Sequence, residues 1–122
     1  MNKNYHIKKS FGYATEGLRV AWKFNANLRI HVIAAFVVLF LGLLLGLTAN
    51  ELVLIILTSI AVIGAEMINT VVEEVVNLVT KEHREEAKIA KDVAAGMVLM
   101  ASFGSVLIGV LVFLPHLVAL FK

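Results

Sequence analysis

Three long apolar stretches dominate the sequence, and polar or charged segments separate them. Residues 30–50 contain no Asp, Glu, Lys or Arg, which suits a membrane-spanning helix of about 20 residues. A second apolar stretch covers 52–79 and a third covers 93–114, and the densely charged linker 80–92 lies between them. This pattern predicts an all-α membrane protein with three transmembrane helices over about 30–48, 50–78 and 86–114.

The segment before the first span has a different pattern. Apolar residues recur at spacings of three and four between Ile7 and Leu28, and most charged residues of the segment lie on other faces. The pattern predicts an amphipathic helix over about 5–28 that lies in the membrane interface, with Tyr13 and Trp22 as interfacial anchors. The alternative is a helix that packs only on its own subunit, and both descriptions can hold together.

The turn between the first two spans is predicted to be very short. The sequence Thr48-Ala-Asn-Glu51 is typical of a capping box, in which Thr48 caps the helix and Glu51 reaches back to the Thr48 backbone. The second span should therefore open directly at this turn.

Composition agrees with a membrane protein. The chain has 122 residues, 60% of them hydrophobic, and a mean hydropathy of +0.89, which excludes an ordinary soluble domain. The chain contains no cysteine, so disulfides and thiolate metal sites are excluded. All Lys and Arg residues except Lys122 lie before the first span or in 80–92, which by the positive-inside rule favours a cytoplasmic N-terminus and an outer C-terminus. This uneven charge indicates membrane orientation rather than nucleic-acid binding. No cleavable signal peptide is expected, because the first 29 residues contain no continuous apolar core.

Four polar residues interrupt the second apolar stretch on one side of the expected helix: Glu66, Asn69, Glu73 and Asn77. A carboxylate at the bilayer centre costs roughly 2–3 kcal/mol or more on insertion scales, so Glu66 is a functional candidate. It could act as a proton relay, a cation-binding group or a general base. The alternative is a protonated carboxyl group that makes a hydrogen bond between helices.

Three residues, Glu73, Lys91 and Asp92, suggest phosphate and cation chemistry near the inner boundary of the membrane. Glu73 can meet a hydrated metal there without complete desolvation, and Mg²⁺ often uses one or two carboxylates together with phosphate oxygens and waters. Lys91 and Asp92 open the third span on the same side, where a lysine can pair with phosphates or extend to lipid headgroups. His31 at the start of the first span is more typical of an interfacial hydrogen-bonding residue than of a ligand.

Four segments together resemble one known family. They are GLRVAW at 17–22, NLRIH at 27–31, AEMINTVVE at 65–73 and AKIAKDVAAG at 87–96. From about residue 10 to its end, the chain resembles the bacterial integral-membrane diacylglycerol kinases. Within that family it is more similar to the Gram-positive-type branch that phosphorylates undecaprenol, on the strength of His31, Asn69-Thr70 and the 87–92 stretch.

The resemblance implies a single membrane-embedded lipid kinase domain over 1–122, a homotrimer with shared active sites, and ATP with Mg²⁺. The implied substrate is a lipid alcohol, undecaprenol in the first place and diacylglycerol as the alternative. Glu66 would match the catalytic base and Glu73 a Mg²⁺ ligand that bridges ATP phosphates. The implied nucleotide contacts are Tyr13, Glu73, Glu82, Lys91 and Asp92, and the implied lipid contacts are Arg19, Asn27, Arg29, His31 and Asn69.

Two positions depart from the family pattern. Asn25 stands where the family usually has a second metal-binding Glu, and Asn77 stands where it has an Asp. An amide oxygen can still coordinate Mg²⁺, so the expected metal ligands are Glu73 and Asn25, with lower affinity than two carboxylates would give. The departures leave open an inactive family member that acts as a membrane scaffold. A proton-coupled transporter that uses Glu66 is disfavoured, because such proteins usually need more spans.

Overall fold

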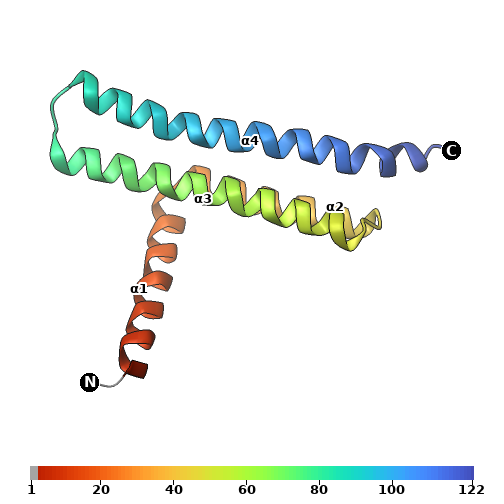
Figure 1. Ribbon diagram of the computed structural model, residues 1–122, viewed down its shortest axis with the longest axis horizontal. Helices are drawn as coiled ribbons and strands as arrows, with labels where there is room; N and C mark the ends of the chain where they lie inside the picture. Colours follow the sequence, from red (N-terminus) through yellow and green to blue (C-terminus); the bar gives the residue numbers. More distant parts are fainter. Residues whose placement is uncertain (1–2) are drawn as a thin grey trace.

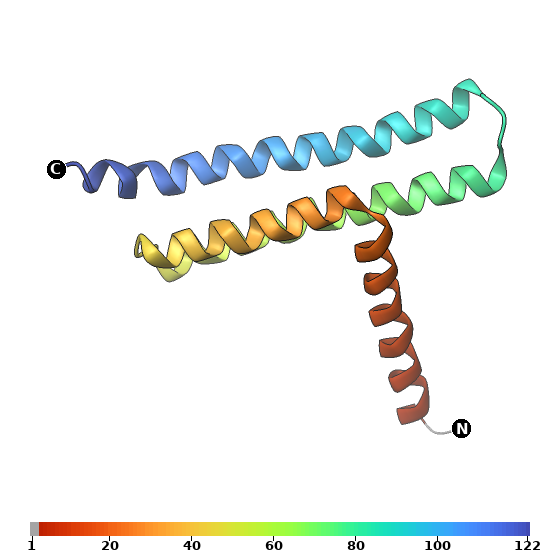
Figure 2. The ribbon, with the colours of Figure 1, turned by 180° about the vertical axis from the view of Figure 1, so that it is seen from behind.

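The computed structural model describes residues 3–122, with side chains from residue 6 onward. Within that part the regular elements are four helices: α1 (Lys3–Phe24), α2 (Ala26–Leu44), α3 (Ala49–Val79) and α4 (Glu85–Ala119). Helices α2, α3 and α4 lie alongside one another, and α1 leaves this bundle at a steep angle (Figure 1). Figure 2 shows the same arrangement from behind, with α2 in front of α3. The predicted all-α class is confirmed.

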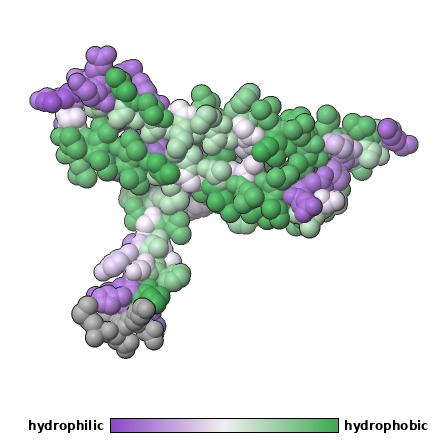
Figure 3. Space-filling view, in the orientation of Figure 1, coloured by the Kyte–Doolittle hydropathy of each residue, from purple (hydrophilic) through white to green (hydrophobic). Residues whose placement is uncertain are grey.

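Helices α2, α3 and α4 are each long and apolar enough to cross a membrane. At 1.5 Å per residue, the 31 residues of α3 extend about 46 Å, which exceeds the hydrocarbon core of about 30 Å. One end of α3 therefore projects beyond the apolar layer. The space-filling view shows an apolar surface along the bundle and hydrophilic residues toward its two ends (Figure 3). The prediction of three candidate spans is confirmed.

The expected interfacial helix over 5–28 divides at Asn25, which lies between α1 and α2. Asn25 has an extended backbone (φ −106°, ψ 107°), and its side chain accepts a hydrogen bond from the backbone N–H of Leu28. It is therefore the N-cap of α2. The first membrane helix begins at Ala26, a few residues earlier than expected, because the apolar pattern continues across the break and conceals it.

The turn between α2 and α3 is short, and a glycine conformation and two capping hydrogen bonds define it. Gly46 adopts φ 72°, a left-handed conformation that disfavours residues with a Cβ atom. Glu51 accepts a hydrogen bond from the Thr48 backbone N–H at 2.7 Å, and the Glu51 N–H donates to the Thr48 hydroxyl at 3.4 Å. The predicted capping box is confirmed.

A small apolar core lies beside this turn. Leu47, Ile55 and Val112 are buried, and partly buried residues of all three long helices surround them. Helix α4 continues through Pro115 to Ala119, whereas the sequence predicted an end near residue 114. A proline so close to a helix end removes only one backbone hydrogen bond, and an apolar environment favours continued helix for the rest.

Most large apolar side chains outside this core are exposed, including Phe36, Leu78, Leu99 and Leu111. Such a surface needs lipid or another protein chain around it. Helix α1 also exposes apolar side chains, among them Phe11, in agreement with the expected interfacial helix. Only one face of α3, which packs against both α2 and α4, is consistently covered.

Candidate functional site

The polar stripe of α3 consists of Glu66, Asn69, Glu73 and Asn77. Glu66 is 3% exposed and Asn69 is 8% exposed, and no other polar or charged residue with a described side chain is buried. Glu73 is exposed, one turn further toward the end of α3 that meets the α3–α4 connection. The stripe therefore runs from the apolar interior of the bundle to a solvent-accessible edge.

The Glu66 carboxylate is held from the α1–α2 junction. The Asn25 side-chain amide donates to Glu66 Oε1 at 3.0 Å and also to the Thr70 hydroxyl. That hydroxyl in turn donates to the Glu66 backbone carbonyl at 2.9 Å. A carboxylate in this setting has a fixed direction and little competition from water, which are the conditions that a general base requires.

Asn69 lies one turn after Glu66 and serves the next carboxylate. Its side-chain amide donates to Glu73 Oε1 at 3.1 Å. Its own carbonyl oxygen, Oδ1, is buried and has no hydrogen-bond partner in the described structure. An unpaired buried acceptor of this kind costs about 1–3 kcal/mol, so a bound group that donates a hydrogen bond to it would be favoured.

Helix α4 brings a lysine to the same stripe. Lys91 Nζ donates to Asn77 Oδ1 at 2.8 Å, which joins the start of α4 to the end of α3. Asp92 instead accepts from Lys88 at 2.9 Å along α4. The sequence-predicted residues Glu66, Asn69 and Glu73 thus lie along one side of α3, and Lys91 contacts Asn77 at the end of the same stripe.

A cavity of about 850 Å³ lies beneath the α3–α4 connection. Glu82 pairs with Arg84 at 3.0 Å at its rim. Basic and acidic side chains alternate around it, and the lining includes Lys81, Glu82, His83, Arg84, Lys88, Lys91 and Asp92. The cationic groups suit a polyphosphate, since Lys and Arg are the usual donors to phosphate oxygens.

The α1 and α2 residues predicted for nucleotide or lipid are placed differently. Tyr13 is 72% exposed on α1, which extends away from the bundle (Figure 1). Arg19 pairs with Glu16 along the same helix at 3.4 Å. Asn27 is exposed in the first turn of α2. The structure does not bring these side chains to the α3 stripe.

Arg29 has a local role at the junction. Its guanidinium donates to the carbonyl oxygens of Trp22 and Lys23 at 2.8 and 3.0 Å, at the end of α1. These carbonyl oxygens have no backbone partner within a helix, so the guanidinium supplies their hydrogen bonds. Its positive charge also interacts favourably with the negative end of the α1 dipole. Together with Asn25, Arg29 fixes the place where α1 meets α2.

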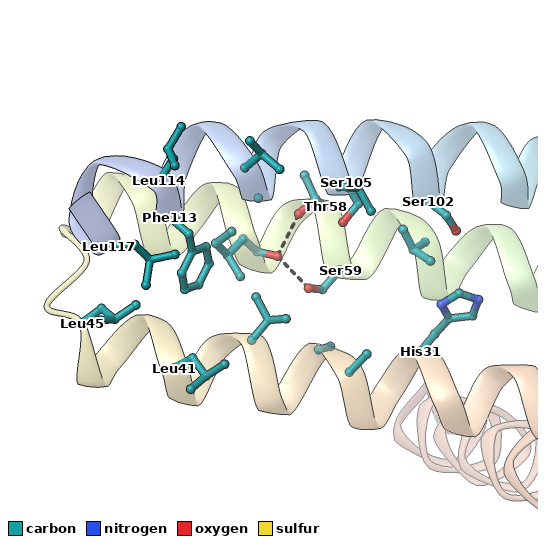
Figure 4. A pocket seen from close by; sticks show the side chains of 18 of the residues that line it. His31, Leu41, Leu45, Thr58, Ser59, Ser102, Ser105, Phe113, Leu114 and Leu117 are labelled. Carbon is teal, nitrogen blue, oxygen red and sulfur yellow. Dashed lines mark hydrogen bonds between the residues drawn. The ribbon is translucent and has the colours of Figure 1, made fainter. Parts of the chain in front are cut away.

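His31 lines a second cavity, of about 820 Å³, between α2, α3 and α4 (Figure 4). Its walls are largely aliphatic, with the hydroxyls of Thr58, Ser59, Ser102 and Ser105 as isolated polar points. Thr58 and Ser59 both donate to the Ile55 carbonyl, at 3.1 and 2.7 Å, so these two hydroxyls are already engaged. This cavity would fit an apolar group, either a lipid tail or the side chains of another apolar helix.

Sequence reasoning gave Thr70 no contact at the site and did not identify the two cavities. Thr70 follows Glu66 by one helical turn, and that spacing was the available signal that the two residues share a face of α3. The contact of Thr70 with Asn25 depends on how α2 and α3 pack. The cavities depend on how α4 lies against α2 and α3, which the pattern along the chain does not specify.

A magnesium ion was expected at Glu73 and Asn25. No group of three or more His, Cys, Asp or Glu residues able to hold a metal occurs between residues 3 and 122. The contacts of Asn25 are with Glu66, Thr70 and Leu28 rather than with Glu73. Glu73 by itself still fits Mg²⁺ shared with phosphates, because that chemistry needs only one or two carboxylates from the protein. Glu73 is exposed, and its Oε1 accepts a hydrogen bond from Asn69.

The chain is similar in sequence to known proteins over most of its length. Residues 12–113 match the prokaryotic diacylglycerol kinase family. A diacylglycerol kinase of Synechocystis is 41% identical over 112 residues, which cover 91% of this chain and 64% of that protein. An undecaprenol kinase of Bacillus subtilis is 38% identical over 109 residues, 89% of each chain, and a diacylglycerol kinase of Escherichia coli K12 is 33% identical over 95 residues, 78% of each. The chain therefore spans somewhat less than two thirds of the Synechocystis relative, and it belongs to the prokaryotic diacylglycerol kinase family.

Proposed function

We propose that this protein transfers the γ-phosphoryl group of ATP to the hydroxyl group of a membrane lipid. The observation that carries the proposal is the buried carboxylate of Glu66, held by Asn25 on an apolar helix of a chain from this family. A lipid hydroxyl reaches such a carboxylate from within the membrane, while a nucleotide reaches the polar end of the same stripe from water. The phosphoryl group would be transferred where the lipid hydroxyl and the nucleotide meet along this stripe.

In the proposed reaction Glu66 accepts the proton of the lipid hydroxyl. The lipid oxygen forms a bond to the γ-phosphorus, the bond from that phosphorus to the β–γ bridging oxygen breaks, and ADP leaves. Positioning and charge neutralisation supply most of the rate in phosphoryl transfer, so a single well-oriented base is sufficient protein chemistry. Asn69, one turn away, supplies a buried oxygen that can accept a donor from the bound lipid.

The nucleotide is proposed to lie at the α3–α4 connection. Lys91, Lys88 and Arg84 offer cations to its phosphates, and Glu82 and Asp92 line the same cavity. Glu73 would hold Mg²⁺ together with the phosphate oxygens, and the ion would offset negative charge on the phosphates when bound. Tyr13 joins the proposed nucleotide contacts only if α1 takes a different position in the assembled protein.

For the lipid we favour undecaprenol over diacylglycerol. The Bacillus subtilis undecaprenol kinase aligns over 89% of both chains, whereas the Synechocystis diacylglycerol kinase extends well beyond the matched region. Diacylglycerol is the second candidate, because that relative has the higher identity, 41%. Arg19, Asn27, Arg29 and His31 are the proposed lipid contacts besides Asn69.

We further propose a homotrimer in the bacterial plasma membrane, with a cytoplasmic N-terminus and an outer C-terminus. The exposed apolar faces of α2 and α4 offer the area for association, and the charges of the α3–α4 connection favour the cytoplasmic side. A trimer would also bring α1 of one subunit near the stripe of another, where Tyr13 and Arg19 would complete a shared site. Native mass spectrometry in detergent measures the subunit number directly.

The test of function uses purified protein, Mg²⁺, radiolabelled ATP and either lipid alcohol in mixed micelles. We expect label in undecaprenyl phosphate at a higher kcat/KM than in phosphatidic acid. A clear preference for diacylglycerol reverses the choice of substrate and leaves the kinase proposal intact. Folded protein that labels neither lipid overturns the proposal and supports a scaffold, the alternative that Asn25 and Asn77 raise.

A further inference from the structure

Asn25 is the one residue between α1 and α2, and its side chain makes contacts in two directions. On one side Asn25 Oδ1 accepts from the Leu28 backbone N–H at 3.0 Å. On the other side Asn25 Nδ2 donates to Glu66 Oε1 at 3.0 Å and to the Thr70 hydroxyl. A single side chain thus joins the start of one membrane helix to the carboxylate of another.

The two contacts fix the orientation of the amide. A backbone N–H requires an acceptor, so the oxygen of Asn25 must face Leu28 and the amino group must face Glu66. An amino group carries no lone pair for a cation, and the oxygen is already engaged at the N-cap. In this arrangement Asn25 offers hydrogen-bond donors to the site and no metal ligand.

We propose that Asn25 is a positioning residue, which orients the Glu66 carboxylate toward the lipid hydroxyl, and that it does not bind the metal. The proposal rests on the lipid kinase function proposed above. It differs from the metal-ligand role that the family pattern suggested for this position.

The physical basis is the freedom of the Glu66 side chain. A glutamate has three rotatable bonds, and on an apolar helix its carboxylate can take several directions. The hydrogen bond from Asn25 selects one of them, and Thr70 fixes Asn25 in turn. Because Asn25 lies at the end of α1, the placement of that helix sets the direction of the base. The mutual position of reacting groups then determines the rate.

Two substitutions separate positioning from capping and from metal binding. Asn25→Ser keeps an N-cap oxygen for Leu28 but loses the donor to Glu66. Positioning predicts a kcat lower by about tenfold to a hundredfold and little change in KM for ATP. The melting temperature should fall moderately, because the buried Glu66 carboxylate loses its side-chain partner. Asn25→Asp also keeps the cap but places a second carboxylate against Glu66, and it should lower kcat at least as far.

A Mg²⁺ titration at saturating ATP and lipid distinguishes the two roles. If Asn25 positions Glu66, the Mg²⁺ concentration for half-maximal activity of Asn25→Ser stays at the wild-type value. If Asn25 is a metal ligand, Asn25→Asp should bind Mg²⁺ more tightly, because a carboxylate adds charge at a cation site. Asn25→Asp with wild-type or higher kcat and a lower Mg²⁺ midpoint would overturn the proposal.

The hydrogen bond itself can be measured without any activity. The side-chain amide resonances of Asn25 in a ¹⁵N-labelled sample should shift strongly in Glu66→Ala, because the acceptor is removed. Unchanged resonances would contradict the contact and therefore the proposal. If the resonances shift but the wild type phosphorylates no lipid, the kinase function fails and the contact between Asn25 and Glu66 stands.

Asn50 provides the matched control. It is an exposed asparagine in the first turn of α3, beside the α2–α3 turn and more than four helical turns before Glu66. Asn50→Ser and Asn50→Asp repeat the same chemical changes and should leave kcat, the Mg²⁺ midpoint and the Asn25 resonances at their wild-type values. An equal loss of kcat in Asn50→Ser would show that the effect is not specific to position 25, and would overturn the inference.

Discussion

The two ends of the α2–α3–α4 bundle hold their glutamates in opposite ways. At the end beside the α2–α3 turn, Glu51 accepts from the Thr48 N–H and hydroxyl and lies 3.1 Å from His116. Its side chain is 28% exposed, so water can supply the hydrogen bonds that the protein does not make to this carboxylate. Toward the other end, Glu66 is 3% exposed and has the Asn25 amide as its side-chain partner.

The difference separates stability from chemistry within one helix. Glu51 completes a capping box beside the apolar core, and each of its contacts favours the folded chain. Glu66 and Asn69 are instead buried polar groups, and Asn69 Oδ1 has no hydrogen-bond partner in the described structure. Burial of this kind lowers stability and suits groups that receive a substrate. Changes at the turn should therefore affect unfolding, and changes at Glu66 should affect turnover.

The largest expected effect comes from Glu66→Gln. Loss of the base should lower kcat by about 10²–10⁴-fold, because a glutamine keeps the shape and the acceptor for Asn25 but cannot take a proton. Binding of a fluorescent ATP analogue should change little, since the proposed phosphate contacts lie elsewhere. The matched change Glu51→Gln should leave kcat unaltered. Near wild-type turnover by Glu66→Gln would mean that this carboxyl is structural.

A smaller effect, on stability, is expected from Glu51→Ala. The change removes the acceptor of the capping box and the partner of His116, and should lower the free energy of unfolding by about 1–2 kcal/mol. The kcat of the folded protein should not change. Thermal unfolding in detergent, followed by circular dichroism, measures the first quantity and the lipid assay the second. A loss of activity without a loss of stability would break the proposed separation between the two ends.

An effect on stability of similar size, with no effect on turnover, is expected at Gly46. An alanine there must adopt a φ near 72°, which costs roughly 1–2 kcal/mol for a residue with a Cβ atom, although no neighbouring atom lies within 4 Å of it. Gly46→Ala should therefore lower the melting temperature and leave kcat unchanged. Gly104→Ala, within α4 and equally free of neighbours, should raise it slightly because the helix gains propensity. Equal shifts in both variants would contradict the role of the left-handed turn.

Much of the candidate site was accessible from the sequence. The 66, 69, 73 and 77 spacing is helical, so one stripe of α3 was predictable from periodicity alone, and its proximity to the Lys91 end of α4 followed from the short linker. The burial of Asn69 with an unpaired oxygen was not predictable, because it depends on neighbouring helices. The exposure of Tyr13 and Arg19 on a helix directed away from the bundle was likewise invisible in the motifs.

The sequence by itself determined the three apolar helices, the short capped turn at Thr48 and the polar stripe, because each follows from local periodicity or from residues three or four positions apart. Only the tertiary structure decided the contacts of Asn25. Along the chain it continues an amphipathic pattern, and nothing nearby identifies it as the break between α1 and α2. Its partners Glu66 and Thr70 lie 41 and 45 residues away, and such pairing depends on how whole helices pack rather than on local sequence.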